Sequence, residues 1–79
     1  MGALNMTSAL IGVGRKIRRA RRETEMSQRA LGERWGELLG RRPFSQALVS
    51  DVERGAAELS ETMLDALAQA LGKHNDYFF

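Results

Sequence analysis

The chain has 79 residues, with no cysteine, one proline, one histidine and a formal net charge of +2 at pH 7. This length fits one domain near the lower limit for a self-supporting core, and without cysteine neither a disulfide framework nor a thiolate metal site is available. The charge is unevenly distributed, because residues 1–45 carry ten Lys and Arg against four Asp and Glu, whereas residues 46–79 carry two against six.

The first uncharged segment, residues 1–14, is too short and too rich in Gly, Asn, Thr and Ser to span a membrane or act as a secretory signal. We expect residues 1–7 to form a flexible arm and residues 8–79 to form the domain. A first helix is predicted from a cap at Thr7 or Ser8 to about Glu23. Its inward residues are Leu10, Val13, Ile17 and Ala20.

Six of the eight residues from Arg15 to Arg22 are cationic. This density predicts a local positive potential that attracts a polyanion, and DNA phosphate is the obvious candidate. The alternative is a solvated helix face of long side chains, and the sequence favours neither reading. The side chains expected to face water or phosphate are those of Arg15, Arg18, Arg19 and Arg22.

Two Ser-Gln pairs, Ser27-Gln28 and Ser45-Gln46, are eighteen residues apart, and each can cap and open a helix. The helix after Ser27 is expected to end near Gly40, and Pro43 forbids its continuation. Its apolar stripe consists of Leu31, Trp35, Leu38 and Leu39, in which Trp35 is read as a core residue.

The second pair opens a shorter helix, from Gln46 to about Arg54, that stops on Gly55. A helical wheel places Ser45, Val49, Val52 and Ala56 inward and Ala47, Ser50, Asp51 and Arg54 outward. A fourth helix is predicted after a cap at Ser60, with a stripe of Leu64, Leu67, Ala68 and Leu71 and an end at Gly72. A last turn capped by Asn75 brings Phe78 against the core and leaves Tyr77 or Phe79 for a partner.

Four blocks occur in a definite order: Gly14-Arg15-Lys16-Ile17-Arg18, Ser27-Gln28-x-x-Leu31, Ser45-Gln46-x-x-Val49-Ser50-x-Val52-Glu53-Arg54-Gly55 and Leu64-x-x-Leu67-Ala68-x-Ala70-Leu71-Gly72. In these blocks the chain resembles the lambda-repressor-like helix-turn-helix family, also called the Cro/C1 or xenobiotic-response-element (XRE) family. The resemblance implies an all-α, compact five-helix DNA-binding domain. The chain departs from the family in about seven extra residues, roughly two helical turns, which we read as an extended second helix and a longer turn over Glu37 to Pro43.

The resemblance implies that the helix from Gln46 to Arg54 enters the major groove of DNA. Gln46 is the first candidate for base reading, because its amide donates and accepts at once, as adenine N6 and N7 require. The other candidates are Ala47 for a thymine methyl, Ser50 for a base or a phosphate, Asp51 for cytosine N4, and Arg54 for guanine or the backbone.

The resemblance also implies that Gln28 bonds phosphate and braces Gln46. The residues by themselves indicate only two capped helix starts, whose free amides favour phosphate. Further phosphate candidates are Arg29, Arg41, Arg42 and Ser45, with a solvated pair as the alternative for Arg41 and Arg42. The resemblance further implies that Glu53 pairs with an arginine of the first helix. Arg21 occupies the matching position, so we expect a structural ion pair between Arg21 and Glu53.

Enzyme function is not supported, because the one histidine, His74, has no cysteine, paired carboxylate or nucleophile near it in sequence. No cofactor or metal is expected. We expect a cytoplasmic, nucleoid-associated transcriptional regulator of the repressor type that binds a palindromic double-stranded DNA operator as a homodimer. The alternative is a protein-binding module of the same fold, an antitoxin or a coactivator, with only weak DNA contact. The chain is either complete or the DNA-binding part of a longer protein.

Overall fold

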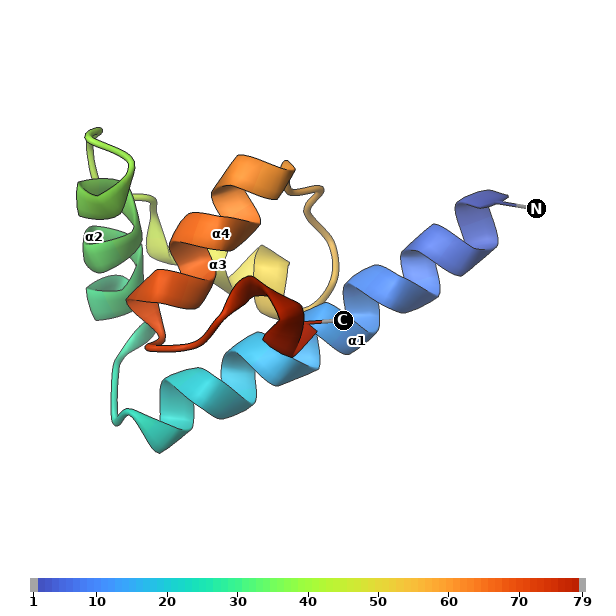
Figure 1. Cartoon of the computed structure of the whole chain (residues 1–79), viewed down its shortest axis with the longest axis horizontal. Helices are drawn as coiled ribbons and strands as arrows, with labels where there is room; N and C mark the ends of the chain where they lie inside the picture. The colour runs from blue at the N-terminus through green and yellow to red at the C-terminus, as the bar shows by residue number, and fades with distance from the viewer. Residues whose placement is uncertain (1, 79) are drawn as a thin grey trace.

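The computed structural model describes the backbone of residues 2–78 and the side chains of residues 12–74 and 76–78. This part forms four α-helices, α1 (Gly2–Glu23), α2 (Gln28–Leu38), α3 (Gln46–Glu53) and α4 (Glu61–Ala70), and a 3-10 turn, η1 (Asn75–Phe78). In Figure 1, α1 runs along one side of the molecule, and η1 brings the C-terminal end of the chain back beside it.

The all-α prediction is confirmed, but the count of five helices is wrong for the residues that the structure describes. The fifth element, η1, has four residues and forms a single 3-10 turn. Such a segment is too short to offset the cost of nucleating an α-helix. It nevertheless does what the sequence predicted, because Phe78 is buried against the core.

Three serines begin helices as predicted. The hydroxyl oxygens of Ser27, Ser45 and Ser60 accept hydrogen bonds from backbone N–H groups three residues later, at 3.0, 3.1 and 3.2 Å. Glycines with a positive φ follow α2, α3 and α4, namely Gly40, Gly55 and Gly72. The boundaries of these helices therefore follow from capping chemistry that the sequence displays.

Two expectations for the helix ends need correction. The backbone of α1 is helical from Gly2, ahead of the cap expected at Thr7 or Ser8, and no proline interrupts this segment. Ser45 and Ala56 are exposed rather than inward, because both lie outside α3, where a helical wheel no longer describes the chain. The side chains of Leu10, Asn75 and Phe79 lie outside the described residues, and the division of the chain at residue 7 stays a prediction.

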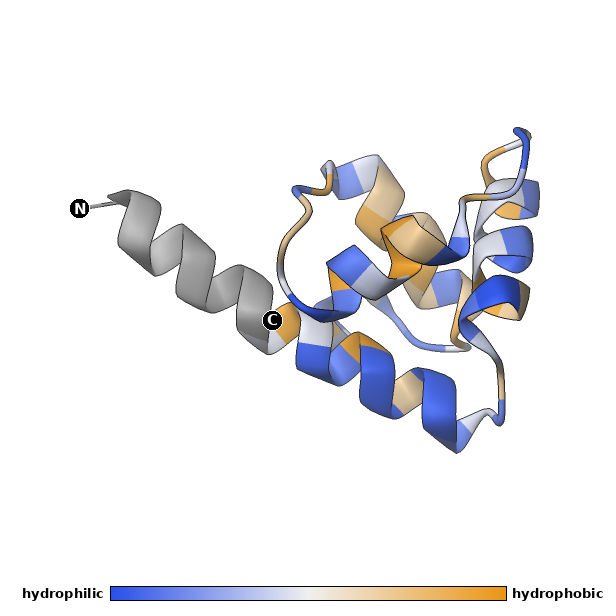
Figure 2. Cartoon of the chain, turned by 180° about the vertical axis from the view of Figure 1, so that it is seen from behind, coloured by the Kyte–Doolittle hydropathy of each residue, from blue (hydrophilic) through white to orange (hydrophobic). Residues whose placement is uncertain are grey.

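The core joins residues from every element. Its largest fully buried side chains are those of Trp35, Ile17, Leu31, Leu67, Leu71 and Val49. The Trp35 indole N–H donates to the backbone oxygen of Met63 at 3.0 Å. The ring centroids of Trp35 and Phe44 are 4.0 Å apart. Trp35 is thus a core residue, as predicted, whereas Leu38 of the same stripe is 37% exposed. In Figure 2, hydrophobic residues gather where the helices meet and hydrophilic residues cover the outside of α1 and α2.

The long connection between α2 and α3 packs directly on the backbone of α2. The Phe44 N–H donates to the Gly32 oxygen at 3.1 Å, and the Arg41 N–H donates to the Gly36 oxygen at 3.0 Å. A Cβ atom at Gly32 would lie 2.2 Å from the Phe44 oxygen, and one at Gly36 would lie 2.5 Å from the Arg42 oxygen. The absence of side chains at these two positions therefore lets the connection approach α2 and fixes where α3 begins.

Replacing Gly32 with Ala should destabilise the fold by about 1–3 kcal/mol, because the new methyl group would displace the backbone at Phe44. Urea unfolding followed by the fluorescence of Trp35 measures this loss. Gly12→Ala is the matched control, since a Cβ there meets nothing within 4 Å and alanine favours the helix by roughly 0.5–1 kcal/mol. Equal stability of the two variants would contradict the close packing of the connection.

Candidate nucleic-acid interface

A buried ion pair joins α1 to α3. Glu53 is only 8% exposed, and its two carboxylate oxygens accept hydrogen bonds from the Arg21 guanidinium at 2.5 and 3.1 Å. The same guanidinium donates to the backbone oxygen of Met26 at 2.9 Å. The pair is therefore two-pronged and supported by a third hydrogen bond, which is the geometry in which a buried charge is tolerated. These are the two residues for which the family resemblance implied an ion pair.

Two glutamines extend this pair to the surface. The Gln28 side-chain amide donates to the Glu53 carboxylate at 3.1 Å. The Gln28 side-chain oxygen in turn lies 3.5 Å from the Gln46 amide nitrogen, at the long limit of a hydrogen bond. The structure thus brings together four of the residues singled out from the sequence. Gln46 is exposed at the first position of α3, where its amide oxygen remains open.

The outward residues of α3 form one stripe beside Gln46. Ala47 and Arg54 are exposed, and Ser50 and Asp51 are half-buried. The Arg54 guanidinium forms an ion pair with the Asp51 carboxylate three residues earlier. The sequence predicts these two residues as separate base contacts, although a spacing of three on a helix also favours such a pair. Apart from this mutually neutralised pair, the stripe carries no charge.

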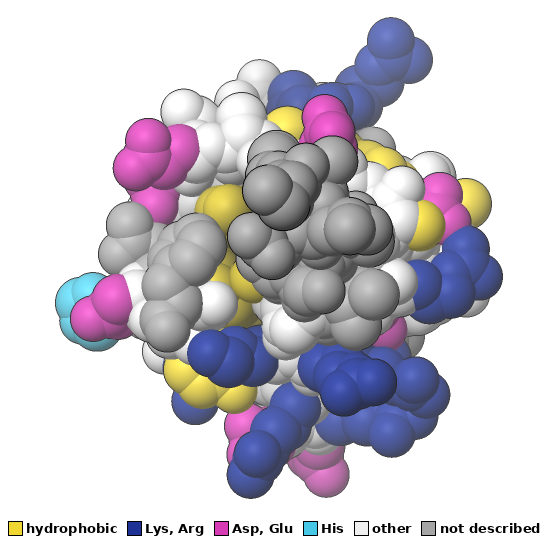
Figure 3. Space-filling view, turned by 90° about the vertical axis from the view of Figure 1, so that its right-hand side faces the viewer, with side chains coloured by type: hydrophobic (Ala, Val, Ile, Leu, Met, Phe, Trp, Pro, Cys, Tyr) yellow, Lys and Arg dark blue, Asp and Glu magenta, His cyan; other side chains and the backbone are white. Residues whose placement is uncertain are grey.

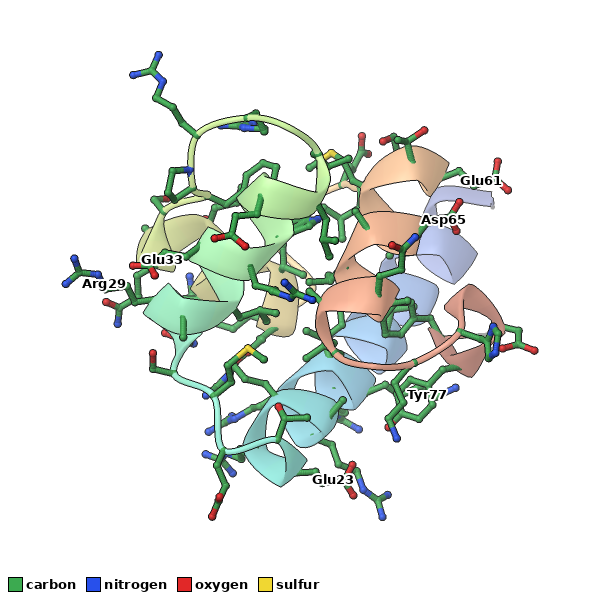
Figure 4. The ribbon with its side chains drawn as sticks, turned by 60° about the vertical axis from the view of Figure 1, so that its left-hand side comes forward. Glu23, Arg29, Glu33, Glu61, Asp65 and Tyr77 are labelled. Carbon is green, nitrogen blue, oxygen red and sulfur yellow. The ribbon has the colours of Figure 1, made fainter. Side chains whose placement is uncertain are left out.

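An open depression of about 390 Å³ lies beside the start of α3. Its lining consists of Arg29, Glu33, Pro43, Phe44, Ser45 and Gln46. Free backbone amides at a helix start favour an anion, and Arg29 adds a cation nearby. Figure 4 shows Arg29 and Glu33 projecting together from α2, and their charged groups are 3.4 Å apart on an exposed surface. Arg29 is therefore close to the expected phosphate site but shares its charge with a carboxylate.

The two arginines of the long connection lie differently. The Arg41 guanidinium lies over the Phe44 ring, 4.0 Å from its centroid, and its Nε donates to the Arg42 backbone oxygen at 3.0 Å. Arg41 is thus held against the connection by its aromatic neighbour, a contact that was not predicted although the two residues are only three apart in sequence. Arg42 is exposed and directly precedes Pro43, the first residue of the connection that lines the depression.

Neither a metal centre nor a membrane span is found in the described part of the chain. No three or more His, Cys, Asp or Glu residues of that part gather where they could hold a metal ion. None of its helices combines the length and the apolar composition needed to cross a bilayer.

Comparison with known proteins gives two matches. A family model described as a helix-turn-helix domain matches residues 13–75. A curated protein of Sinorhizobium fredii, named as an uncharacterized HTH-type transcriptional regulator, y4aM, is 41% identical over 69 residues. These residues cover 87% of this chain but 43% of the relative, so the chain spans less than half of that protein's length. No solved structure matches the chain significantly.

Removing the Arg21 side chain should cost about 3 kcal/mol of stability, because the Glu53 carboxylate would remain buried with Gln28 as its main partner. The free energy of unfolding of Arg21→Ala, measured by urea titration, tests this. Arg29→Ala is the control, since it breaks a pair that is exposed to solvent and contributes at most about 1 kcal/mol. A loss no larger than that of the control would mean that the buried pair contributes nothing to the fold.

Proposed function

Since the chain belongs to the helix-turn-helix DNA-binding family of the Cro/C1, or XRE, type, we propose that it is a sequence-specific transcriptional regulator that inserts α3 into the major groove of DNA. The observation that carries this proposal is the series of side-chain contacts that runs from Arg21 through Glu53 and Gln28 to Gln46. It connects Gln46, the first residue of α3, to groups of α1 and α2, with the last contact at the long limit of a hydrogen bond. A surface glutamine without a reading function would not need such support.

Base reading is assigned to the exposed stripe of α3. Gln46 bonds adenine through N6 and N7, because its amide oxygen is open and its amide nitrogen has a second proton to donate. Ala47, one residue on, contacts a thymine methyl group. Ser50, one turn after Gln46, bonds a base edge or the adjacent phosphate. None of these three side chains carries charge, so they add hydrogen-bonding and apolar contacts rather than electrostatic attraction to the backbone.

Arg54 is proposed to read guanine, with Asp51 holding it in position. A carboxylate that engages one side of a guanidinium restricts its rotation and leaves other N–H groups for the O6 and N7 acceptors of guanine. From the sequence, Asp51 is a candidate for cytosine N4. The ion pair favours the positioning role instead, because the carboxylate already has a partner in the free protein.

Phosphate contacts are assigned around the start of α3. Gln28 and the free amides that follow Ser45 are assigned to one backbone strand. Arg29 lines the depression beside this helix start, and Arg41 and Arg42 lie on the connection that leads to it. Arg42 is the freest of the three arginines, whereas binding by Arg29 or Arg41 requires each to leave its contact with Glu33 or Phe44. Their contacts set affinity and register but carry no sequence information.

The proposed assembly is a two-fold homodimer on a palindromic operator, acting as a repressor in the cytoplasm, at the nucleoid. Half-sites about 34 Å apart would place two copies of α3 in successive major grooves on one side of the duplex. The matched relative is more than twice as long as the aligned region, and residues beyond such a region are one place where a dimer interface or an effector site can lie. The described residues act in this proposal as the DNA-reading unit.

The pair of changes Gln46→Ala and Ser50→Ala should abolish operator preference. A site selected from a random DNA pool by the unchanged protein, and a scrambled duplex, are compared at one salt concentration. The ratio of the two affinities should fall by about fivefold or more, since a bidentate base contact contributes about 1–3 kcal/mol. Gln69→Ala, on the exposed side of α4, is the control. An unchanged ratio in the double variant would reject α3 as the reading helix and favour a protein-binding module of the same fold.

Asp51→Asn should weaken the preference for guanine at one position of the selected site, by up to about fivefold, because an exposed pair that orients Arg54 is worth at most about 1 kcal/mol. The remaining positions should keep their preferences. Repeating the selection with the variant and with Asp76→Asn, an exposed aspartate on η1, measures this effect. If cytosine preference is lost and guanine preference is kept, Asp51 reads a base itself.

A further inference from the structure

A second basic surface lies on α1, outside the helix-turn-helix. Four arginines, Arg15, Arg18, Arg19 and Arg22, line an open groove of about 520 Å³ together with Glu23. We refer to these four as the arginine track. All four side chains are exposed and point away from the core formed by Val13, Ile17 and Ala20. The fold therefore does not use their charged groups.

The track is poorly neutralised. Among the described residues its one ion pair joins Arg19 to Glu23 at 3.8 Å, with both side chains more than half exposed. Arg15 and Arg19, and likewise Arg18 and Arg22, are four residues apart on the helix, a spacing at which like charges repel. The helix therefore holds a cluster of positive charge that destabilises it in isolation. An anionic ligand would reduce that repulsion. A solvated face of mixed charge would have no such repulsion to reduce.

The track borders the surface assigned to DNA. Arg21, which reaches Glu53 beside Gln28, lies between Arg18 and Arg22 in sequence. At about 100° per residue, Arg18 and Arg22 are displaced from Arg21 by roughly 60° and 100°, in the same sense, toward solvent. In the view of Figure 3, Lys and Arg side chains gather along the lower part of the molecule, with a few acidic side chains among them. The track thus continues outward from the end where α1, α2 and α3 meet.

We propose that the arginine track binds the sugar-phosphate backbone of duplex DNA flanking the site that α3 reads. This inference rests on the proposed function. A guanidinium fits a phosphate through two parallel hydrogen bonds, and the track presents arginine at all four positions. The four residues extend over about 10 Å of helix, and a duplex offers one negative charge per roughly 1.7 Å of its axis. A repeating anion next to the reading helix fits a row of cations better than a single acidic side chain does.

The test compares Arg18→Gln/Arg22→Gln with a control that removes two positive charges elsewhere, Arg34→Gln/Lys73→Gln on α2 and after α4. Affinity for the selected site and for a scrambled duplex is measured between about 50 and about 200 mM salt. The track variant should lose affinity for both duplexes by the same factor. Its salt slope should fall by about 1.8, so the fourfold rise in salt should weaken it about twelvefold less than the unchanged protein. The control should keep its slope.

Flanking DNA provides the second readout. Extending a duplex that contains only the selected site should strengthen binding by the unchanged protein and by the control, but not by the track variant. A salt slope equal to that of the control, or an equal gain from the flanks, would overturn the proposal, and a loss confined to binding of polyglutamate would assign the track to acidic protein. If the unchanged protein prefers no sequence, the proposed function fails, while a reduced slope in the variant would still support the track.

Discussion

The ion pair of Arg21 with Glu53 is the constraint on which the rest of this structure depends. A carboxylate that is only 8% exposed is unfavourable unless its oxygens are satisfied, and Arg21 and Gln28 satisfy them at 2.5, 3.1 and 3.1 Å. Hydrophobic contact between α1 and α3 is non-directional and would tolerate small rotations of α3. The hydrogen bonds to Glu53 do not, and they therefore fix the rotation that decides which side of α3 faces outward.

The connection between α2 and α3 fixes the position of the first residue of α3. Extra residues before a reading helix would normally let it change position, because a longer loop has more conformations. Here the connection lies on Gly32 and Gly36, its Phe44 ring packs on Trp35, and Arg41 covers the outer side of that ring. The added length is thereby converted into packed structure. The start of α3 is fixed at Ser45 by the connection, while its far end is fixed at Glu53 by the ion pair.

Local chemistry explains which features the sequence could predict. The serine caps, the glycine ends and the buried stripes depend on residues within one turn of each other, and α2, α3 and α4 begin where the sequence placed them. The pairing of Arg21 with Glu53 spans 32 residues and came from family resemblance, since no local pattern specifies it. The role of Gly32 and Gly36 depends on the distant backbone that packs on them, which no local sequence pattern specifies. The prediction of Asp51 and Arg54 as separate base contacts did not include the ion pair that joins them. The base and phosphate contacts themselves stay predictions.

The distribution of charge separates two tasks in the proposed complex. The outward stripe of α3 is neutral apart from the Asp51–Arg54 pair, so it can add little to the attraction between protein and phosphate. Glu53, the remaining acidic residue of α3, is neutralised inside the fold by Arg21. Apart from Arg54, the exposed cations of the described residues are on α1, α2 and the α2–α3 connection, beside α3 rather than on it. A reading surface of this kind binds weakly on its own but discriminates by unpaired donors and acceptors, whereas the surrounding arginines raise affinity for every sequence equally. In the proposed complex, specificity and salt-dependent affinity therefore lie mainly in different side chains, with Arg54 as the one charged side chain assigned to a base.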